Sequence, residues 1–283
     1  MWATGRGTVA PAARYPPGVA SVAVVVHEVA LDQPGPVVAR LAGLLDAGEA
    51  ARVDRLADPR ARARRVVAAA ATRALVAAAA GADDPAALPI SRRCAHCGHA
   101  EHGKPFLAGR PDVAFGVAHS GDRALVAVAR APVRIGVDVE VVRPRARLEA
   151  LAARVLDDGA HARWRALAEA DRLRAFYEEW TAKEAYLKAI GVGITRPLRA
   201  VPAAPPGWTI APARRRARRG GAPRGRRRRR HHRARALRAR GAGTLVAVST
   251  YAEGTPPGPG GADGPGGSTG SRAPRPARCS RRA

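Results

Sequence analysis

Hydrophobic and polar residues alternate with the periods of strands and helices over the first 210 residues of the chain. Runs rich in Val predict strands over residues 20–30, 112–118, 124–129 and 134–141, with a last short one at 207–210. Runs of Ala, Leu and Arg predict helices over residues 39–55, 59–80, 148–156 and 160–191, the last broken near residues 169–171. Residues 83–109 predict strand and loop. The order of strand, helices and strands occurs twice, which predicts an α+β fold with two similar halves.

One predicted strand carries acidic side chains on a single face. Within residues 134–141 the apolar side chains alternate with Gly136, Asp138 and Glu140, so both carboxylates project from the same face. Two neighbouring anions favour a cation, and hard oxygen ligands completed by phosphate and water suit Mg²⁺ better than zinc. The other interpretation is an edge strand with acids on its solvent-facing side, which is a routine pattern.

A further acid lies in the helical segment FYEEWTAKEAYLK at residues 176–188. Glu184 and Lys188 are four residues apart and share one helix face, with Trp180 one turn earlier on the same side. Such spacing is also that of an exposed ion pair, which contributes little to stability. A carboxylate and an ammonium one turn apart could equally hold a metal ion together with its phosphate ligand.

The net charge of +26 is concentrated near the C-terminus. Residues 211–283 contain 20 Arg and 2 acids, whereas the first 210 residues carry a net charge of +8. The Arg runs and the Gly and Pro that follow predict a largely disordered tail, in which residues 243–251 (GTLVAVSTY) alone resemble a strand. Another hypothesis is that this Arg-rich tail results from out-of-frame reading of a GC-rich gene.

The longest apolar stretch, residues 19–26, is too short for a bilayer, so we expect a cytoplasmic protein without membrane contact.

Two cysteines and three histidines cluster in a short segment: Cys94, His96, Cys97, His99 and His102. A zinc site is one interpretation of this cluster. Structural zinc, however, usually needs a second, separated pair of ligands, and Cys279 in the tail is a poor candidate for that pair. With zinc here and the Arg runs as a phosphate-binding arm, the alternative function is a basic nucleic-acid-binding protein. The charge distribution argues against this alternative, because the basic excess lies in the tail.

Two motifs in one order resemble a known enzyme family. Residues 135–140 (IGVDVE), followed some forty residues later by 180–188 (WTAKEAYLK) and 191–194 (GVGI), closely resemble the paired signatures of surfactin-synthetase-activating (Sfp-like) 4′-phosphopantetheinyl transferases. Residues 103–105 (GKP) and 118–122 (AHSGD) are similar to the family's upstream motifs, although many members have Ser where Ala118 stands. The resemblance extends over residues 39–194.

This resemblance implies an activity and a fold. Members transfer the 4′-phosphopantetheine group of coenzyme A to a serine of an apo acyl or peptidyl carrier protein, depend on Mg²⁺, release adenosine 3′,5′-bisphosphate, and serve polyketide and nonribosomal peptide biosynthesis. Two similar α/β subdomains packed as a pseudo-dimer, with the active site in the crevice between them, are implied as the fold. We therefore expect a coenzyme A-binding subdomain over residues 1–132, a metal-binding and catalytic subdomain over 133–210, and a tail over 211–283. The protein is expected to be a monomer that binds nucleic acid, if at all, through the tail.

The resemblance also implies roles for individual residues. Asp138, Glu140 and Glu184 are the implied Mg²⁺ ligands. The residues implied to contact coenzyme A are Arg65, Arg73, Lys104, His119, Lys183 and Lys188. Glu184 and Lys188 are the expected catalytic residues, with Glu184 taking the serine proton and Lys188 stabilising the departing charge. The segment of Cys94 is then a loop that brings Lys104 to coenzyme A.

Overall fold

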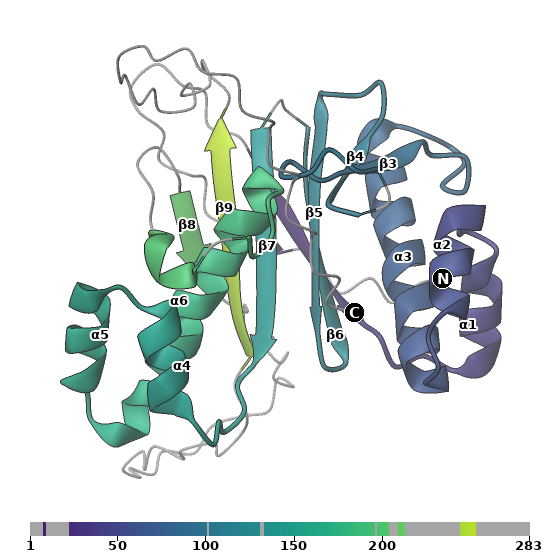
Figure 1. Ribbon diagram of the computed structural model, residues 1–283. Helices are drawn as coiled ribbons and strands as arrows, with labels where there is room; N and C mark the ends of the chain where they lie inside the picture. Colours follow the sequence, from purple (N-terminus) through teal and green to yellow (C-terminus); the bar gives the residue numbers. More distant parts are fainter. Residues whose placement is uncertain are drawn as a thin grey trace, which may run out of the picture.

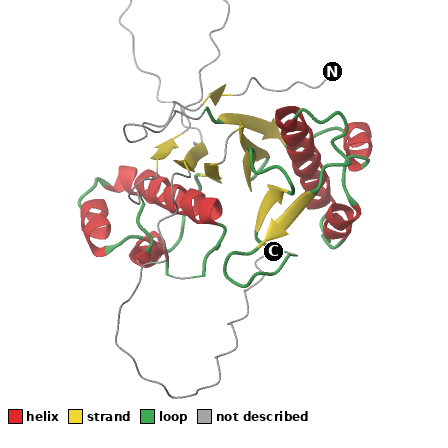
Figure 2. Cartoon of the chain, turned by 90° about the horizontal axis from the view of Figure 1, so that it is seen from above, coloured by secondary structure: helices red, strands yellow, loops and turns green. Residues whose placement is uncertain are grey.

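A computed structural model describes residues 8–9, 23–100, 102–130, 133–195, 197–203, 209–212 and 244–252 of the chain (Figure 1). Helices and antiparallel strands occur together throughout these residues, which confirms the predicted α+β content. Seen from above, the helices form two groups on opposite outer sides, and the strands lie between them (Figure 2). Among the described helices, none is long and apolar enough to cross a membrane.

The first sheet has four strands in the order β1-β2-β6-β5, and three helices cover one side of it. Its strands are β1 (Thr8–Val9), β2 (Val25–Ala30), β5 (Val113–Ser120) and β6 (Arg123–Arg130). Its helices are α1 (Gly35–Ala42), α2 (Ala47–Asp54) and α3 (Pro59–Ala80). Val67 of α3 packs with Leu41 of α1 and Ala124 of β6, so the helices and the sheet share one apolar core.

A two-stranded hairpin follows α3 and consists of β3 (Ile90–Arg93) and β4 (Lys104–Leu107). Gly103 begins its return with a φ of +97°, and a Cβ at this position would lie 2.4 Å from the carbonyl oxygen of Arg93. Only glycine fits so close an approach in this backbone conformation. The glycine therefore shapes the loop that leads into Lys104.

The second sheet has the order β7-β9-β8, with β7 at Val133–Val141, β9 at Thr244–Ala252 and β8 at Thr209–Pro212. Strand β9 pairs with β7 along the whole length of both. It confirms the strand predicted at residues 243–251, and it forms the middle of this sheet. The accompanying helices are α4 (Leu148–Val155), α5 (Asp158–Arg165), α6 (Glu169–Ile190) and the short 3₁₀ helix η1 (Leu198–Ala200).

The close packing of α6 on β7 depends on Gly136. A Cβ at Gly136 would lie 1.9 Å from the carbonyl oxygen of Ala185 and 2.4 Å from the backbone nitrogen of Ala189, so any larger residue would push the helix away. Strand β5 lies on the other side of β7, because a Cβ at Gly116 would lie 3.4 Å from the carbonyl oxygen of Ile135. Gly136, which belongs to the IGVDVE motif, thus lets α6 lie directly against the strand that carries Asp138 and Glu140.

The structure corrects the extent of one predicted helix and confirms a break in another, shifted by a few residues. The single helix expected over residues 39–55 is interrupted, because Asp46 caps α2 by accepting a hydrogen bond from the backbone nitrogen of Glu49, whose side chain in turn accepts from the backbone of Asp46. The break expected near residues 169–171 lies at residues 166–168. The predicted strand 20–30 is confirmed from Val25 onward, residues 23–24 precede the strand, and residues 20–22 lie outside the described part of the chain.

Candidate functional site

Asp138 of β7 and Glu184 of α6 lie on two elements that pack against each other, and each has a buried carboxylate oxygen without a hydrogen-bond partner. Asp138 is 3% exposed, and its Oδ2 atom has no hydrogen-bond partner. Glu184 Oε1 is likewise buried and without one. The other oxygen of Asp138, Oδ1, pairs with the Lys188 ammonium. Buried carboxylate oxygens without partners are costly, so this arrangement suits the binding of a further positive group.

Burial and mutual repulsion raise the pKa values of Asp138 and Glu184. Burial raises the pKa of Asp138 to about 7, and the charges of Glu140 and Glu184 add to the rise while Lys188 opposes it. The pKa of Glu184 is also raised, first by burial and then by Glu140, against the effect of Lys188. One ammonium therefore does not balance the three carboxylates, and a divalent cation would favour their ionised forms.

Glu140 is oriented by two side chains from other elements. Ser120, the last residue of β5, donates a hydrogen bond of 3.2 Å to Glu140 Oε2, and Trp180 of α6 donates one of 3.3 Å from Nε1 to Oε1. The sequence predicted Trp180 on the same helix face as Glu184, and its bond to Glu140 agrees with that prediction. The role of Ser120 was not apparent from the sequence, because the serine there belongs to a turn-like Ser-Gly-Asp string.

The acids fit Mg²⁺ by chemistry, since all three offer hard oxygen ligands. Their oxygen atoms are spread more widely than the ligands of one bound ion. Among the described residues, the group of three with one ligand atom each within 4.8 Å of the others is Cys94, Cys97 and His102. In the structure Lys188 provides the positive charge beside Asp138.

A basic pocket adjoins the acids across β5. It is open to solvent, with an empty volume of about 580 Å³ that includes solvent at its mouth. Its charged and ionisable lining residues come from α2, α3, β3 and β5 and are Glu49, Arg52, Arg65, Arg92 and His119. Burial lowers the pKa of His119, and the charges of Arg65 and Lys188 lower it further. The pocket and the acid site are therefore neighbours. His119 lines the pocket, and the next residue, Ser120, is hydrogen-bonded to Glu140 in the acid site.

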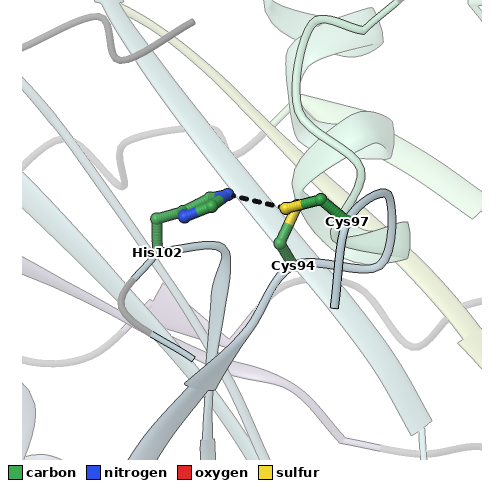
Figure 3. A group of neighbouring side chains, drawn as sticks. All are labelled: Cys94, Cys97 and His102. Carbon is green, nitrogen blue, oxygen red and sulfur yellow. Dashed lines mark hydrogen bonds between the residues drawn. The ribbon is translucent and has the colours of Figure 1, made fainter. Parts of the chain in front are cut away.

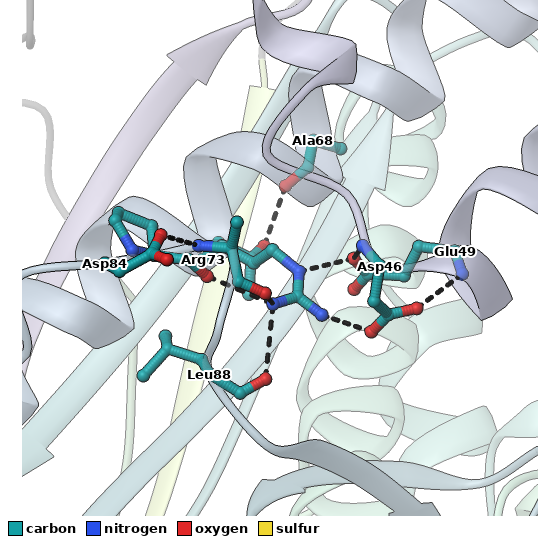
Figure 4. A network of polar contacts seen from close by, with 9 residues as sticks. Asp46, Glu49, Ala68, Arg73, Asp84 and Leu88 are labelled. Atoms are coloured by element: carbon teal, nitrogen blue, oxygen red, sulfur yellow. Dashed lines mark hydrogen bonds and ion pairs between the residues drawn. The ribbon is translucent and has the colours of Figure 1, made fainter.

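Arg73 does not reach this pocket, contrary to the expected phosphate contact (Figure 4). Its side chain is fully buried and its guanidinium donates to five groups: the carboxylates of Asp46 and Glu49 and the backbone carbonyls of Pro85, Ala86 and Leu88. The guanidinium thus ties α3 to α2 and to the loop before β3. Arg52 and Arg92, which sequence reasoning missed, line the pocket instead.

Lys183 is likewise placed in the interior, and the expected phosphate contact does not fit its position. Its Nζ atom donates to the carbonyl oxygens of Val155 and Leu198 at 2.7 and 3.2 Å. These bonds hold α6 against the end of α4 and against η1. Lys104 lies on β4, and its Nζ atom donates to the carbonyl oxygen of Ala189 at 2.8 Å, so it touches the end of the helix that carries Glu184 and Lys188.

Comparisons with known proteins agree with the motifs. The family model of the 4′-phosphopantetheinyl transferase superfamily matches residues 134–232. The chain is 32% identical over 186 residues to the 4′-phosphopantetheinyl transferase HetI of Nostoc sp. (strain PCC 7120), covering 64% of this chain and 75% of HetI. It is 39% identical over 94 residues to AcpT of Salmonella typhimurium (33% of this chain, 48% of AcpT), and 32% identical over 98 residues to a 4′-phosphopantetheinyl transferase of Bacillus subtilis (35% and 42%).

Proposed function

The chain belongs to the 4′-phosphopantetheinyl transferase superfamily, and on that premise we propose that it transfers the 4′-phosphopantetheine group of coenzyme A to a serine of an apo acyl or peptidyl carrier protein. The serine oxygen bonds to the phosphorus that carries pantetheine, the pyrophosphate bond breaks, and adenosine 3′,5′-bisphosphate leaves. The observation that carries this proposal is the pair of buried, unpartnered oxygens on Asp138 and Glu184 beside an arginine-lined pocket.

Asp138, Glu140 and Glu184 would hold Mg²⁺. When bound, the ion would neutralise charge that builds on the pyrophosphate during transfer. Ser120 and Trp180 fix the direction of the Glu140 carboxylate. Gly136 keeps α6 close enough for Glu184 to share the site with Asp138. These contacts support a ligand set assembled from one strand and one helix.

The coenzyme A phosphates would lie along the basic side of the site. Arg65 is exposed in the pocket, and its guanidinium can bind the adenosine 3′-phosphate through two hydrogen bonds. Arg52 and Arg92 add positive charge there. His119 lines this pocket, and the charge of Lys188 acts on it, which suits a contact with the pyrophosphate. Lys104 would approach from β4, beside the end of α6.

Glu184 is the proposed base. Its unpartnered Oε1 atom can take the proton from the serine hydroxyl, directly or through a water molecule, and its raised pKa makes it a better base at neutral pH. Lys188 lies one turn further along α6 and would stabilise charge on the departing phosphate. Glu184 could instead serve only as a ligand. Coenzyme A binding and the single-turnover rate of Glu184→Gln separate the two roles, since loss of binding with an unchanged rate at saturation would leave the ligand role alone.

We propose that the two sheets with their helices are the two subdomains of a pseudo-dimer, divided near residues 132 and 133, with the active site in the crevice between them. Strand β9 adds a strand from residues 211–283 to the second subdomain. The protein would act as a cytoplasmic monomer in polyketide or nonribosomal peptide biosynthesis. The relatives are named as transferases, so they do not support the nucleic-acid-binding alternative.

The decisive experiment incubates the purified chain with coenzyme A, Mg²⁺ and a panel of apo carrier proteins, and then weighs each carrier. A gain equal to one phosphopantetheine group on a serine is the expected result, with omission of Mg²⁺ as the control. No gain on any carrier of a broad panel would contradict the proposed function.

A further inference from the structure

A second cluster of ligand atoms lies in the loop between β3 and β4, outside the carboxylate site. The sulfur atoms of Cys94 and Cys97 and a ring nitrogen of His102 all lie within 4.8 Å of one another (Figure 3). Cys97 Sγ is 3.2 Å from His102 Nε2. The two thiols are not joined in a disulfide. The two cysteines come from the start of the loop and the histidine from its end, so the cluster closes the loop upon itself.

The spacing of these atoms is close to that of a zinc ligand set. Zn²⁺ lies about 2.3 Å from sulfur and about 2.0 Å from imidazole nitrogen, so two ligands of a tetrahedral ion are about 3.4 to 3.8 Å apart. The one bonded pair, Cys97 Sγ and His102 Nε2, lies 3.2 Å apart, and the other pairs lie within 4.8 Å, so the cluster is close to this spacing. Two thiolates and an imidazole are a soft donor set, which selects zinc over Mg²⁺.

The backbone already holds the loop in a suitable shape. Gly98 donates from its backbone nitrogen to the carbonyl oxygen of Cys94 at 2.8 Å, which curls the Cys-x-x-Cys segment into one turn. Cys94 donates from its own nitrogen to the carbonyl oxygen of His99 at 3.0 Å. Gly103 then allows the strand to return within van der Waals contact of Cys94. The ligands thus come together through local folding of ten residues.

We propose that Cys94, Cys97 and His102 bind a structural Zn²⁺ ion, distinct from the ion expected at Asp138. Water or a neighbouring imidazole completes the tetrahedron. His99 is the nearby imidazole, and its ring stacks on that of His102 with the centroids 5.9 Å apart, so its side chain would have to turn to reach the ion. From the sequence alone the zinc site stayed undecided, because a second pair of ligands was missing. The fold reduces that need by returning His102 to the cysteines.

The consequence of zinc would be to fix the position of Lys104. The loop contacts the end of α6 through a hydrogen bond of 3.3 Å from the nitrogen of Ala95 to the carbonyl oxygen of Gly191. Gly191 also packs against the Lys104 side chain, because a Cβ there would lie 3.3 Å from Lys104 Cβ. An ion that locks the loop would therefore hold β4 against the helix of Glu184.

The test measures metal content in the full chain, purified without a metal-affinity tag and in the presence of a mild reductant. Mass spectrometry of the metals is expected to find about one zinc per chain. Cys97→Ser and His102→Ala are expected to lose most of it. Cys279→Ser and His96→Ala remove the third cysteine of the chain and an exposed histidine of the same loop, and are expected to keep it.

A second readout covers the case in which the ligand variants fail to fold. Replacing the native metal of the wild-type chain by Co²⁺ is expected to give thiolate-to-cobalt charge-transfer absorption and the intense visible bands of a tetrahedral ion. Absence of both zinc and this absorption would overturn the proposal, as would equal zinc in Cys97→Ser and wild type. None of these readouts depends on transferase activity.

Discussion

Ser120 Oγ donates a hydrogen bond to Glu140 Oε2 although the two residues lie on strands of different sheets. The same hydroxyl accepts a bond of 3.2 Å from the backbone nitrogen of Val141. Ser120 therefore fixes both the Glu140 carboxylate, a proposed Mg²⁺ ligand, and the strand that carries it. His119, the residue before it, lines the basic pocket, so the end of β5 connects the two parts of the candidate site.

Ser120→Ala is expected to weaken the binding of Mg²⁺ more than it slows transfer. Loss of a hydrogen bond to a charged group costs about 1.5–3 kcal/mol, so the Mg²⁺ concentration at half-maximal rate should rise by a factor between about 10 and 150, with kcat at saturating Mg²⁺ little changed. The measurement is the rate as a function of Mg²⁺ concentration. Ser91→Ala, at an exposed position on β3, is the matched control. Unchanged Mg²⁺ dependence in Ser120→Ala would show that the serine does not orient the ligand.

Asp138→Asn is expected to abolish transfer while the protein stays folded. The amide keeps the shape of the side chain and removes a buried charge that repulsion already disfavours, whereas Lys188, 37% exposed, can turn to solvent. Mg²⁺ should raise the melting temperature of the wild type and leave that of the variant unchanged, because a ligand that binds only the native state stabilises it. Near-wild-type turnover by Asp138→Asn would mean that the acids hold no catalytic metal.

Arg65→Ala is expected to raise KM for coenzyme A with little effect on kcat, since the adenosine phosphate does not react. The same substitution should be nearly silent when dephospho-coenzyme A, which lacks the 3′-phosphate, is the donor. Steady-state kinetics with both donors measure this. The expected 3′-phosphate contact is wrong if the penalty is the same for both.

Arg73→Ala is expected to act on stability instead of on binding. Removing one partner of a buried ion pair costs about 3–5 kcal/mol, because the carboxylates of Asp46 and Glu49 lose their counter-ion and three carbonyls lose a donor. Thermal unfolding should show a lower melting temperature for Arg73→Ala than for Arg65→Ala. The contrary order would place Arg73 at the surface.

These two arginines show where sequence reasoning ends. They are eight residues apart on α3, whose bounds were predicted correctly from its run of helix-forming residues; in the structure Asp58 caps its start and Gly81 ends it, and both signals are local. Which arginine is buried depends on α2, which brings Asp46 and Glu49 to one of them and not to the other. The alternation of β7 was equally local and was predicted. Long-range contacts, such as the pairing of β9 with β7 or the bond from Ser120 to Glu140, leave no comparable pattern in the sequence.

His119 is expected to stay neutral at neutral pH and to titrate below the usual value for histidine, because burial and the charges of Arg65 and Lys188 lower its pKa. A pKa lower in the folded than in the unfolded state stabilises the fold above about pH 6.5, and that contribution is lost as the pH falls through the folded value. Wild type should therefore lose stability relative to His119→Gln on acidification, because glutamine does not titrate. Binding of adenosine 3′,5′-bisphosphate should raise the pKa of His119, since an anion favours the imidazolium. NMR titration of the histidine rings measures both effects, with His27 as the control: its pKa is lowered by burial on β2, and it is absent from the pocket lining. An equal response of both rings, or none from His119, would place the nucleotide phosphates elsewhere.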